Sequence, residues 1–169
     1  MSASRLRAQT FALWSEHNPA LDTSPMEIVA QIKRISSLLD VAVEPVYAAA
    51  ALTSAEVELL VPLRYADEAV TAIRLAELLG MSRAGVSKTL ANLERKGMIS
   101  RATNPADRRS ALIVLSDAGI HAIDDVFPRE LEAHARLLAG LGQNRQKVLA
   151  ALNDLAETME SSLGLAAGG

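Results

Sequence analysis

Residues 73–115 contain two short amphipathic segments followed by two runs of residues that favour strands, and this order constrains the fold more than any other feature. The first segment ends at Gly80, a residue type that suits the left-handed backbone position just after a helix. The second segment carries Val86, Leu90 and Leu93 at i, i+4 and i+7, which is the spacing of one buried helical face. The pattern therefore predicts two helices joined by a tight turn.

A β-hairpin is predicted directly after the second helix. Residues 98–101 and 111–115 favour strands, and the turn-forming stretch 104–107 lies between them. Arg108 and Arg109 give the tip of this hairpin a positive charge. Helix, turn, helix and hairpin in this order are typical of a winged helix-turn-helix, which places its second helix in the major groove of DNA.

The composition favours helices in the rest of the chain. Aromatic residues make up 3% of the 169 residues, whereas Ala and Leu are abundant, so residues that favour sheets are scarce. The expected fold is mainly α with a small β-hairpin wing, in which a helical region accompanies the winged helix-turn-helix lobe. The absence of cysteine excludes disulfides, thiolate zinc sites and iron–sulfur ligation.

The apolar stretches are too short to indicate a membrane protein. None approaches the roughly 20 residues that a membrane-spanning helix needs. Polar residues at positions 15–18 interrupt the apolar run near the N-terminus, unlike the core of a signal peptide. We therefore expect a cytoplasmic protein of bacterial type that has no membrane partner.

Two capping boxes predict helix starts outside the central unit. Ser24 and Glu27, with Pro25 at the first helical position, predict one start, and Thr53 and Glu56 predict another. Two apolar stripes have helical spacing. The stripe that follows the first of these helix starts comprises Ile28, Ile32, Ile35 and Leu39. The stripe in the last predicted helix comprises Val148, Leu152, Leu155 and Met159.

Ser116 can cap a further helix after the hairpin. Within that helix, Pro128 is expected to cause a bend or a break.

Positive charge is concentrated in the central unit although the whole chain has a net charge of −3. Residues 71–109 include eight basic and three acidic residues, a local charge of +5 that leaves −8 on the remainder. The local field attracts phosphates more than the total charge does, so this segregation indicates a nucleic-acid surface. Chance clustering of charges is the alternative.

The outer face of the second helix and the hairpin tip supply the candidate DNA contacts. Their side chains and backbone can donate to phosphates or base edges, and glycine allows a close approach. Arginines at the tip suit the adjacent minor groove. The candidates are Ser82, Arg83, Gly85, Ser87, Lys88 and Asn92 on the helix, and Arg108 and Arg109 on the hairpin.

Residues 73–119 resemble the winged-helix lobe of the MarR family of bacterial regulators. The most specific segments are Val-Ser-Lys-Thr-Leu-Ala-Asn-Leu-Glu-Arg-Lys-Gly-Met-Ile and the wing sequence Asp-Arg-Arg-Ser. The helices from about residue 25 to 162 also match the layout of the family, so the resemblance covers most of the chain.

The resemblance implies an obligate homodimer with intertwined terminal helices, which binds a pseudo-palindromic operator in double-stranded DNA. It implies a small aromatic or amphipathic effector that loosens DNA binding, and we expect a repressor. By the same resemblance Arg109 reaches the minor groove and Asp107 orients it through an ion pair. The expected regions are N-terminal dimerisation helices (1–52), the DNA-binding lobe (53–115), C-terminal dimerisation helices (116–163) and a loose tail (164–169).

The first 26 residues resemble a branch of the family that has an extra N-terminal helix and includes members responsive to urate or similar anions. The resemblance implies a ligand pocket formed by Trp14, Glu58 and Arg101. Thr89 stands where that branch has an arginine in the DNA-recognition helix, so the sequence departs here from the pattern of a urate-binding site.

Simpler roles for these residues remain open. Trp14 can dock a terminal helix, and Glu58 can be a solvated surface residue. His121, Asp125 and His134 have spacing from which a metal site can be imagined.

Other classes of protein were also weighed. No cofactor is expected, and no phosphate-binding loop, nucleophile elbow or zinc-protease motif is present, so the chain is not expected to be an enzyme. A helical module that binds other proteins is the competing class.

Overall fold

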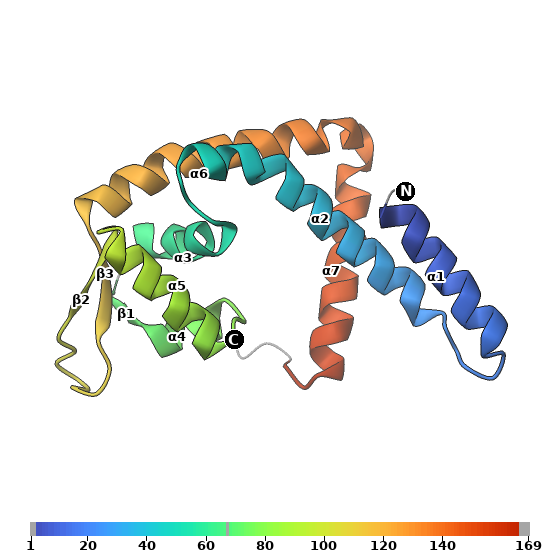
Figure 1. Ribbon diagram of the computed structural model, residues 1–169, viewed down its shortest axis with the longest axis horizontal. Coiled ribbons are helices and arrows are strands. Elements are labelled where there is room, and N and C mark those ends of the chain that lie inside the picture. Colours follow the sequence, from blue (N-terminus) through green and yellow to red (C-terminus); the bar gives the residue numbers. More distant parts are fainter. Residues whose placement is uncertain (1–2, 67, 166–169) are drawn as a thin grey trace. The chain divides into compact units, whose positions relative to one another are not determined.

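The structure, a computed structural model, describes residues 3–66 and 68–165. It divides into two compact units, residues 1–134 and 135–169. The first contains α1 (Ala3–His17), α2 (Pro25–Ala49), α3 (Ser54–Arg64), β1 (Val70–Thr71), α4 (Ala72–Leu78), α5 (Arg83–Arg95), β2 (Ile99–Ala102), β3 (Leu112–Leu115) and most of α6 (Asp117–Leu138) (Figure 1). The second contains the end of α6, the 3₁₀ helix η1 (Ala139–Asn144) and α7 (Arg145–Ser162). The predicted mainly α fold with a small β-hairpin wing is confirmed.

Local sequence signals determine how α3 begins and how α4 ends. At the start of α3, Thr53 Oγ1 accepts a hydrogen bond from the Glu56 N–H at 3.3 Å, and Glu56 Oε2 accepts one from the Thr53 N–H at 2.8 Å. Gly80 follows α4 with φ +61°, and the Met81 N–H then donates to the Ala76 carbonyl at 3.0 Å. Both the capping box and the tight helix-turn-helix turn are confirmed.

The predicted capping box at Ser24 is not formed. Ser24 has a helical backbone (φ −56°, ψ −35°) instead of the extended one that a capping residue needs, and its side chain makes no cap bond. Its N–H donates to Asp22 Oδ1 at 3.0 Å. Helix α6 continues through Pro128, so the break that was one of the two expectations there is not formed.

The three strands form an antiparallel sheet in the order β1–β3–β2. Ile99 lies opposite Leu115 and Ala102 opposite Leu112, so β2 and β3 form the predicted hairpin. The short strand β1 pairs with the other edge of β3. It was not predicted, because two residues are too few to show the alternation by which strands are recognised.

The core of the first unit holds α5 against the other helices of the lobe. Val86, Leu90 and Leu93 are each 0% exposed, which confirms the face predicted from their spacing. Gly119 brings the first turn of α6 against the base of the hairpin, since a Cβ at this position would collide with the Met98 carbonyl oxygen. Any larger residue at position 119 would push the wing away from α6.

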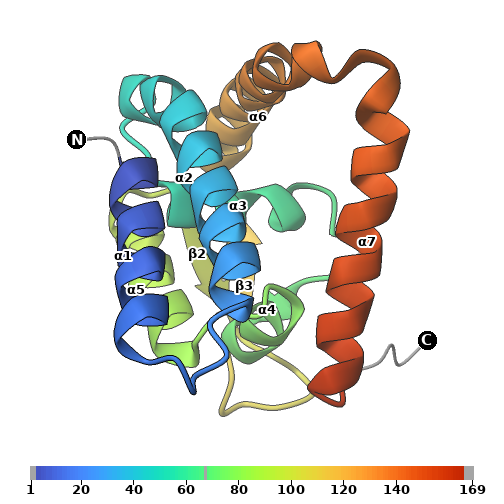
Figure 2. The same cartoon turned by 90° about the vertical axis from the view of Figure 1, so that its right-hand side faces the viewer.

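Helices α1 and α2 leave apolar residues uncovered. Helix α1 lies beside α2 (Figure 2), and the hydroxyls of Ser15 and Thr23 lie 2.7 Å apart at their junction. Exposed apolar residues on α2 include Ile28, Ile32 and Ile35, and those on α7 include Val148, Leu152 and Met159.

Among the described residues, no single helix is both long and apolar enough to cross a membrane. Only α2 and α3 taken together have that length and composition, and the pair is bent by 80°.

Candidate nucleic-acid interface

Helix α5 presents a polar outer face because its apolar residues are buried on the inner face. Ser82, Arg83, Ser87 and Lys88 are exposed along this outer face and at its start. All four were predicted as DNA contacts, and their exposure is compatible with that role, which remains a prediction.

Ser82 and Gly85 also have a local role at the start of α5. Ser82 Oγ accepts a hydrogen bond from the Gly85 N–H at 3.1 Å and so caps the helix. A Cβ at position 85 would lie 3.0 Å from this oxygen, which is tighter than an ordinary contact. The glycine is therefore explained by the cap as well as by an approach to DNA.

The predicted ion pair between Asp107 and Arg109 is not formed. Both side chains are described, and the Asp107 carboxylate accepts hydrogen bonds from the Arg109 backbone N–H and the Ser110 hydroxyl, each at 3.0 Å. Both carboxylate oxygens of Asp107 thus accept hydrogen bonds within the turn, and Arg109 is exposed. Arg108 is exposed beside it.

The structure separates the eight basic residues of the 71–109 segment into two groups. Arg74, Lys96 and Arg101 form ion pairs, with Glu77, Glu56 and Glu94 respectively, and Arg95 donates to Asn92. Within the described part of the chain, the other four have no carboxylate partner, and they are Arg83, Lys88, Arg108 and Arg109. The cations without partners are thus the four that were predicted to contact DNA.

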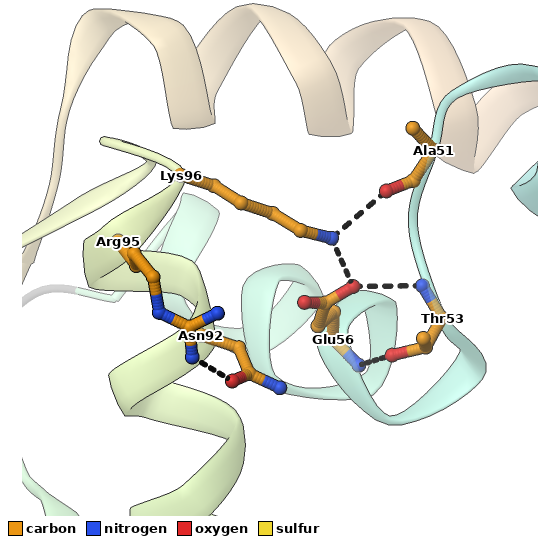
Figure 3. Close-up of polar contacts among 6 residues, drawn as sticks. All are labelled: Ala51, Thr53, Glu56, Asn92, Arg95 and Lys96. Carbon is orange, nitrogen blue, oxygen red and sulfur yellow. Dashed lines mark hydrogen bonds and ion pairs between the residues drawn. The ribbon is translucent and has the colours of Figure 1, made fainter.

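Lys96 belongs to a network that joins the end of α5 to the loop before α3 (Figure 3). Its ammonium group donates to Glu56 Oε2 at 2.7 Å and to the Ala51 carbonyl at 2.8 Å. Ala51 has φ +53°, a left-handed conformation that is costly for a residue with a Cβ. Lys96 was counted among the basic residues of the predicted nucleic-acid surface, because nothing in the sequence pairs it with a residue forty positions earlier.

Glu56 is the acidic centre of this network and is 1% exposed. Burial alone would raise the pKa of its carboxyl group, but hydrogen bonds from Lys96 and Thr53, with the charge of Lys96, lower that pKa below its usual value. Glu56 is therefore ionised at neutral pH and holds Lys96 in place.

Asn92 is only partly available to DNA. Its side-chain oxygen accepts a hydrogen bond from the Arg95 guanidinium group one turn along α5, as Figure 3 shows. Its amide group retains two donors for a base or a phosphate.

The three residues predicted to form a ligand pocket do not line a pocket that lies along α2 in the first unit. Trp14 is 51% exposed on α1, Glu58 is exposed on α3, and Arg101 pairs with Glu94 at 3.0 Å on β2. The pocket has a volume of about 350 Å³ and lies along α2 and the loop before α3, with Asp40, Val41, Val43, Glu44, Tyr47, Ala48, Leu52, Thr53 and Ser54 as its lining.

These lining residues were not predicted to form a pocket, since they share no motif. Burial and the nearby Glu130 carboxylate raise the pKa of the Tyr47 hydroxyl, so Tyr47 is a neutral hydrogen-bonding group there.

The imagined metal site at His121, Asp125 and His134 gains no support. His121 Nδ1 lies 2.6 Å from the Asp117 carbonyl oxygen, and Asp125 accepts a hydrogen bond from Arg129 at 3.0 Å. In the part of the chain that the structure describes, no three histidine or carboxylate side chains are grouped as metal ligands would be.

The chain is similar to known regulators of transcription. Residues 52–110 match the model of the MarR family. The chain is 28% identical over 141 residues to the transcriptional regulator PecS of Dickeya dadantii. The aligned region covers 82% of this chain and 85% of PecS. Its fold is similar to that of Staphylococcus aureus MepR in a DNA complex, with a TM-score of 0.69, 23% identity and coverage of 78% of this chain and 95% of MepR. It is likewise similar to Bordetella bronchiseptica BpsR, whose DNA binding is regulated by 6-hydroxynicotinic acid, with a TM-score of 0.69, 18% identity and coverage of 78% and 99%.

The fold and the exposed cationic surface define a DNA-binding protein of the winged helix-turn-helix class. The winged-helix lobe matches the model of the MarR family, and the chain is similar over most of its length to a regulator of transcription. The prediction that it is not an enzyme is confirmed by its relatives, which regulate transcription.

Proposed function

We propose that this regulator is a homodimeric repressor that binds a pseudo-palindromic operator and releases it when a small aromatic or amphipathic effector binds. Each subunit places α5 in a major groove and its wing in the adjacent minor groove, with the two half-sites about one helical turn apart. The repression is by occupancy of the promoter.

One observation carries the DNA-binding part of the proposal. Arg83 and Lys88 on α5, and Arg108 and Arg109 on the wing, are exposed and have no carboxylate partner within the described residues. In the same segment, the basic side chains that lie away from the outer face of α5 and from the wing tip form ion pairs or a hydrogen bond with neighbouring residues. Cations that are free on a helix face and on a wing supply the two contacts that the class makes with DNA.

Arg109→Ala is expected to weaken operator binding by about tenfold and to flatten its dependence on salt. Each lost phosphate or groove contact reduces the slope of log K against log [salt] by about 1 per subunit. Fluorescence anisotropy with a labelled DNA fragment from the promoter of the protein's own gene, at several salt concentrations, measures both quantities.

Arg129→Ala is the matched control, because it removes an equal charge from α6, where Arg129 pairs with Asp125 at 3.0 Å. If Arg109→Ala and this control had the same slope of log K against log [salt], the proposed contact of the wing with DNA would be contradicted. A wild-type chain without any salt-sensitive specific complex would favour the competing class, a helical module that binds other proteins.

The exposed apolar helices support the homodimer. Ile28 on α2 is 52% exposed and Leu152 on α7 is 47% exposed, although apolar stripes of this length are normally covered. A second copy of the chain would cover both stripes, as coiled-coil-like seams do.

The pocket along α2 supports a small effector. It combines apolar residues such as Val43 and Leu52 with polar ones such as Thr53 and Ser54, which is the mixture that binds small organic molecules. We expect an aromatic ligand of this pocket to raise the melting temperature of the protein and to lower its DNA affinity. A thermal-shift screen of small aromatic compounds, followed by anisotropy with each hit, tests this, and hits that leave DNA binding unchanged would contradict it.

A further inference from the structure

The pocket along α2 lies in a stretch of the chain that contains no basic residue. Residues 35–63 carry no lysine, arginine or histidine, and their acidic residues are Asp40, Glu44, Glu56 and Glu58. All the residues that line the pocket belong to this stretch, from Asp40 to Ser54. The segment that forms the pocket therefore supplies negative charge and no positive charge.

The tertiary structure neutralises one of these four carboxylates. Glu56 pairs with Lys96 at 2.7 Å. Within the described part of the chain, Asp40, Glu44 and Glu58 form no ion pair. The pocket thus keeps two exposed carboxylates in its lining, those of Asp40 and Glu44.

Asp40 and Glu44 lie one turn apart on the same face of α2. Like charges at this spacing repel each other. A cation that binds in the pocket would relieve this repulsion and would be attracted by both carboxylates, whereas an anion would be repelled by both.

The surroundings of Tyr47 are also negative. Tyr47 lines the pocket, and burial together with the carboxylates of Glu130, Asp40 and Glu58 raises the pKa of its hydroxyl. Glu130 Oε2 is buried, and it has no hydrogen-bond partner among the described residues. A second anion beside Tyr47 would add to the repulsion between these groups.

We infer that this pocket selects a small organic cation, with an apolar aromatic body and one amine that is protonated at neutral pH. The inference rests on the proposed function, in which an effector binds in this pocket, and it names the charge of that effector. Val43 and Leu52 favour the apolar body, and Asp40 and Glu44 favour the ammonium group. Such a ligand has the opposite charge to urate and similar anions.

An organic cation suits the pocket better than a metal ion does. A metal ion needs several oxygen ligands at close range. Among the residues that the structure describes, no three histidine or carboxylate side chains are grouped in that way. The pocket has a volume of about 350 Å³ and apolar lining residues, which are properties of sites for small organic molecules.

Three indole compounds that differ in charge test the inference on the full chain. Tryptamine carries an ammonium group, tryptophol a neutral hydroxyl and indolepropionate a carboxylate, each on the same ring and the same two-carbon chain. Isothermal titration calorimetry measures the affinity of each. Since solvent screens the exposed carboxylates, we expect tryptamine to bind about tenfold more tightly than indolepropionate, with tryptophol between them. The difference should shrink as the salt concentration rises.

Asp40→Asn combined with Glu44→Gln removes both charges with little change in side-chain size. We expect this double variant to bind tryptamine about fivefold more weakly than the wild type does. Its affinity for tryptophol should stay unchanged, because a neutral ligand does not sense the lost charges, and this shows that the pocket is intact. Glu27→Gln is the matched control, since Glu27 is exposed on the first turn of α2 and does not line the pocket.

Equal affinities for the three compounds, tighter binding of indolepropionate or no binding of tryptamine would overturn the inference. A double variant that binds tryptamine as the wild type does would also overturn it. Fluorescence anisotropy with the promoter fragment separates this result from the proposed function. If tryptamine binds with the expected preference and leaves DNA affinity unchanged, the role of the pocket as an effector site is contradicted, and its preference for a cation stands.

Discussion

Leu152→Glu is expected to convert the dimer into a monomer and to lower operator affinity by about a hundredfold or more. Leu152 belongs to the apolar seam of α7 and is 47% exposed, so the proposed dimer buries it against the second copy. A carboxylate there would lose its hydration without gaining a partner. Two linked half-site contacts bind far more tightly than one, and a monomer loses that advantage.

Analytical ultracentrifugation at micromolar concentration measures the oligomeric state, and anisotropy with the promoter fragment measures the affinity. Gln146→Glu is the matched control, because it adds the same charge to α7 at an exposed position away from the seam. A Leu152→Glu protein that remains a dimer would place the interface elsewhere. A monomer that keeps its full operator affinity would contradict the dimeric mode of binding.

Glu56→Gln is expected to lower the free energy of unfolding by about 2–3 kcal/mol at neutral pH. Breaking a fully buried ion pair costs about 3–5 kcal/mol, and the expected loss is smaller here since the Lys96 side chain is 36% exposed. The glutamine removes the negative charge that balances Lys96 and keeps only a neutral acceptor oxygen beside the Ala51 carbonyl. Urea unfolding followed by circular dichroism measures the change, at unchanged slope if the denatured state is unaffected.

Glu58→Gln provides the comparison for Glu56→Gln. Glu58 lies two residues along the same helix, is exposed, and has no ion pair among the described residues. Its replacement is expected to change stability by less than about 0.5 kcal/mol. Similar losses in the two variants would mean that the contact with Lys96 contributes nothing specific.

The stability that Glu56 contributes should also depend on pH. Its pKa is lower in the folded chain than its ordinary value of 4.5, so the unfolded chain binds more protons in that range. The contribution is therefore complete above pH 4.5 and is lost as pH falls through the folded-state pKa. We expect the wild type and Glu56→Gln to converge in stability at acidic pH, and a constant difference down to pH 3 would contradict the assignment.

Much of the lobe could be predicted from the sequence because its signals are local. The capping box of Thr53 and Glu56 depends on residues three positions apart, and the turn at Gly80 depends on one glycine after a helix. The burial of Val86, Leu90 and Leu93 follows from the geometry of a single helix. Where a local rule failed, as at Ser24, the backbone before α2 took a conformation that the rule does not anticipate.

Positions far apart in the sequence were decided only by the tertiary structure. The partner of Lys96, the collision that requires glycine at position 119, and the pocket along α2 all depend on which elements pack together. The same holds for the choice of which arginines and lysines stay free. The sequence by itself determined the helices, the wing and the concentration of positive charge, since these arise within a few residues of one another. Only the folded chain could assign each charge a partner, because an ion pair depends on a distance in space that the order of residues does not contain.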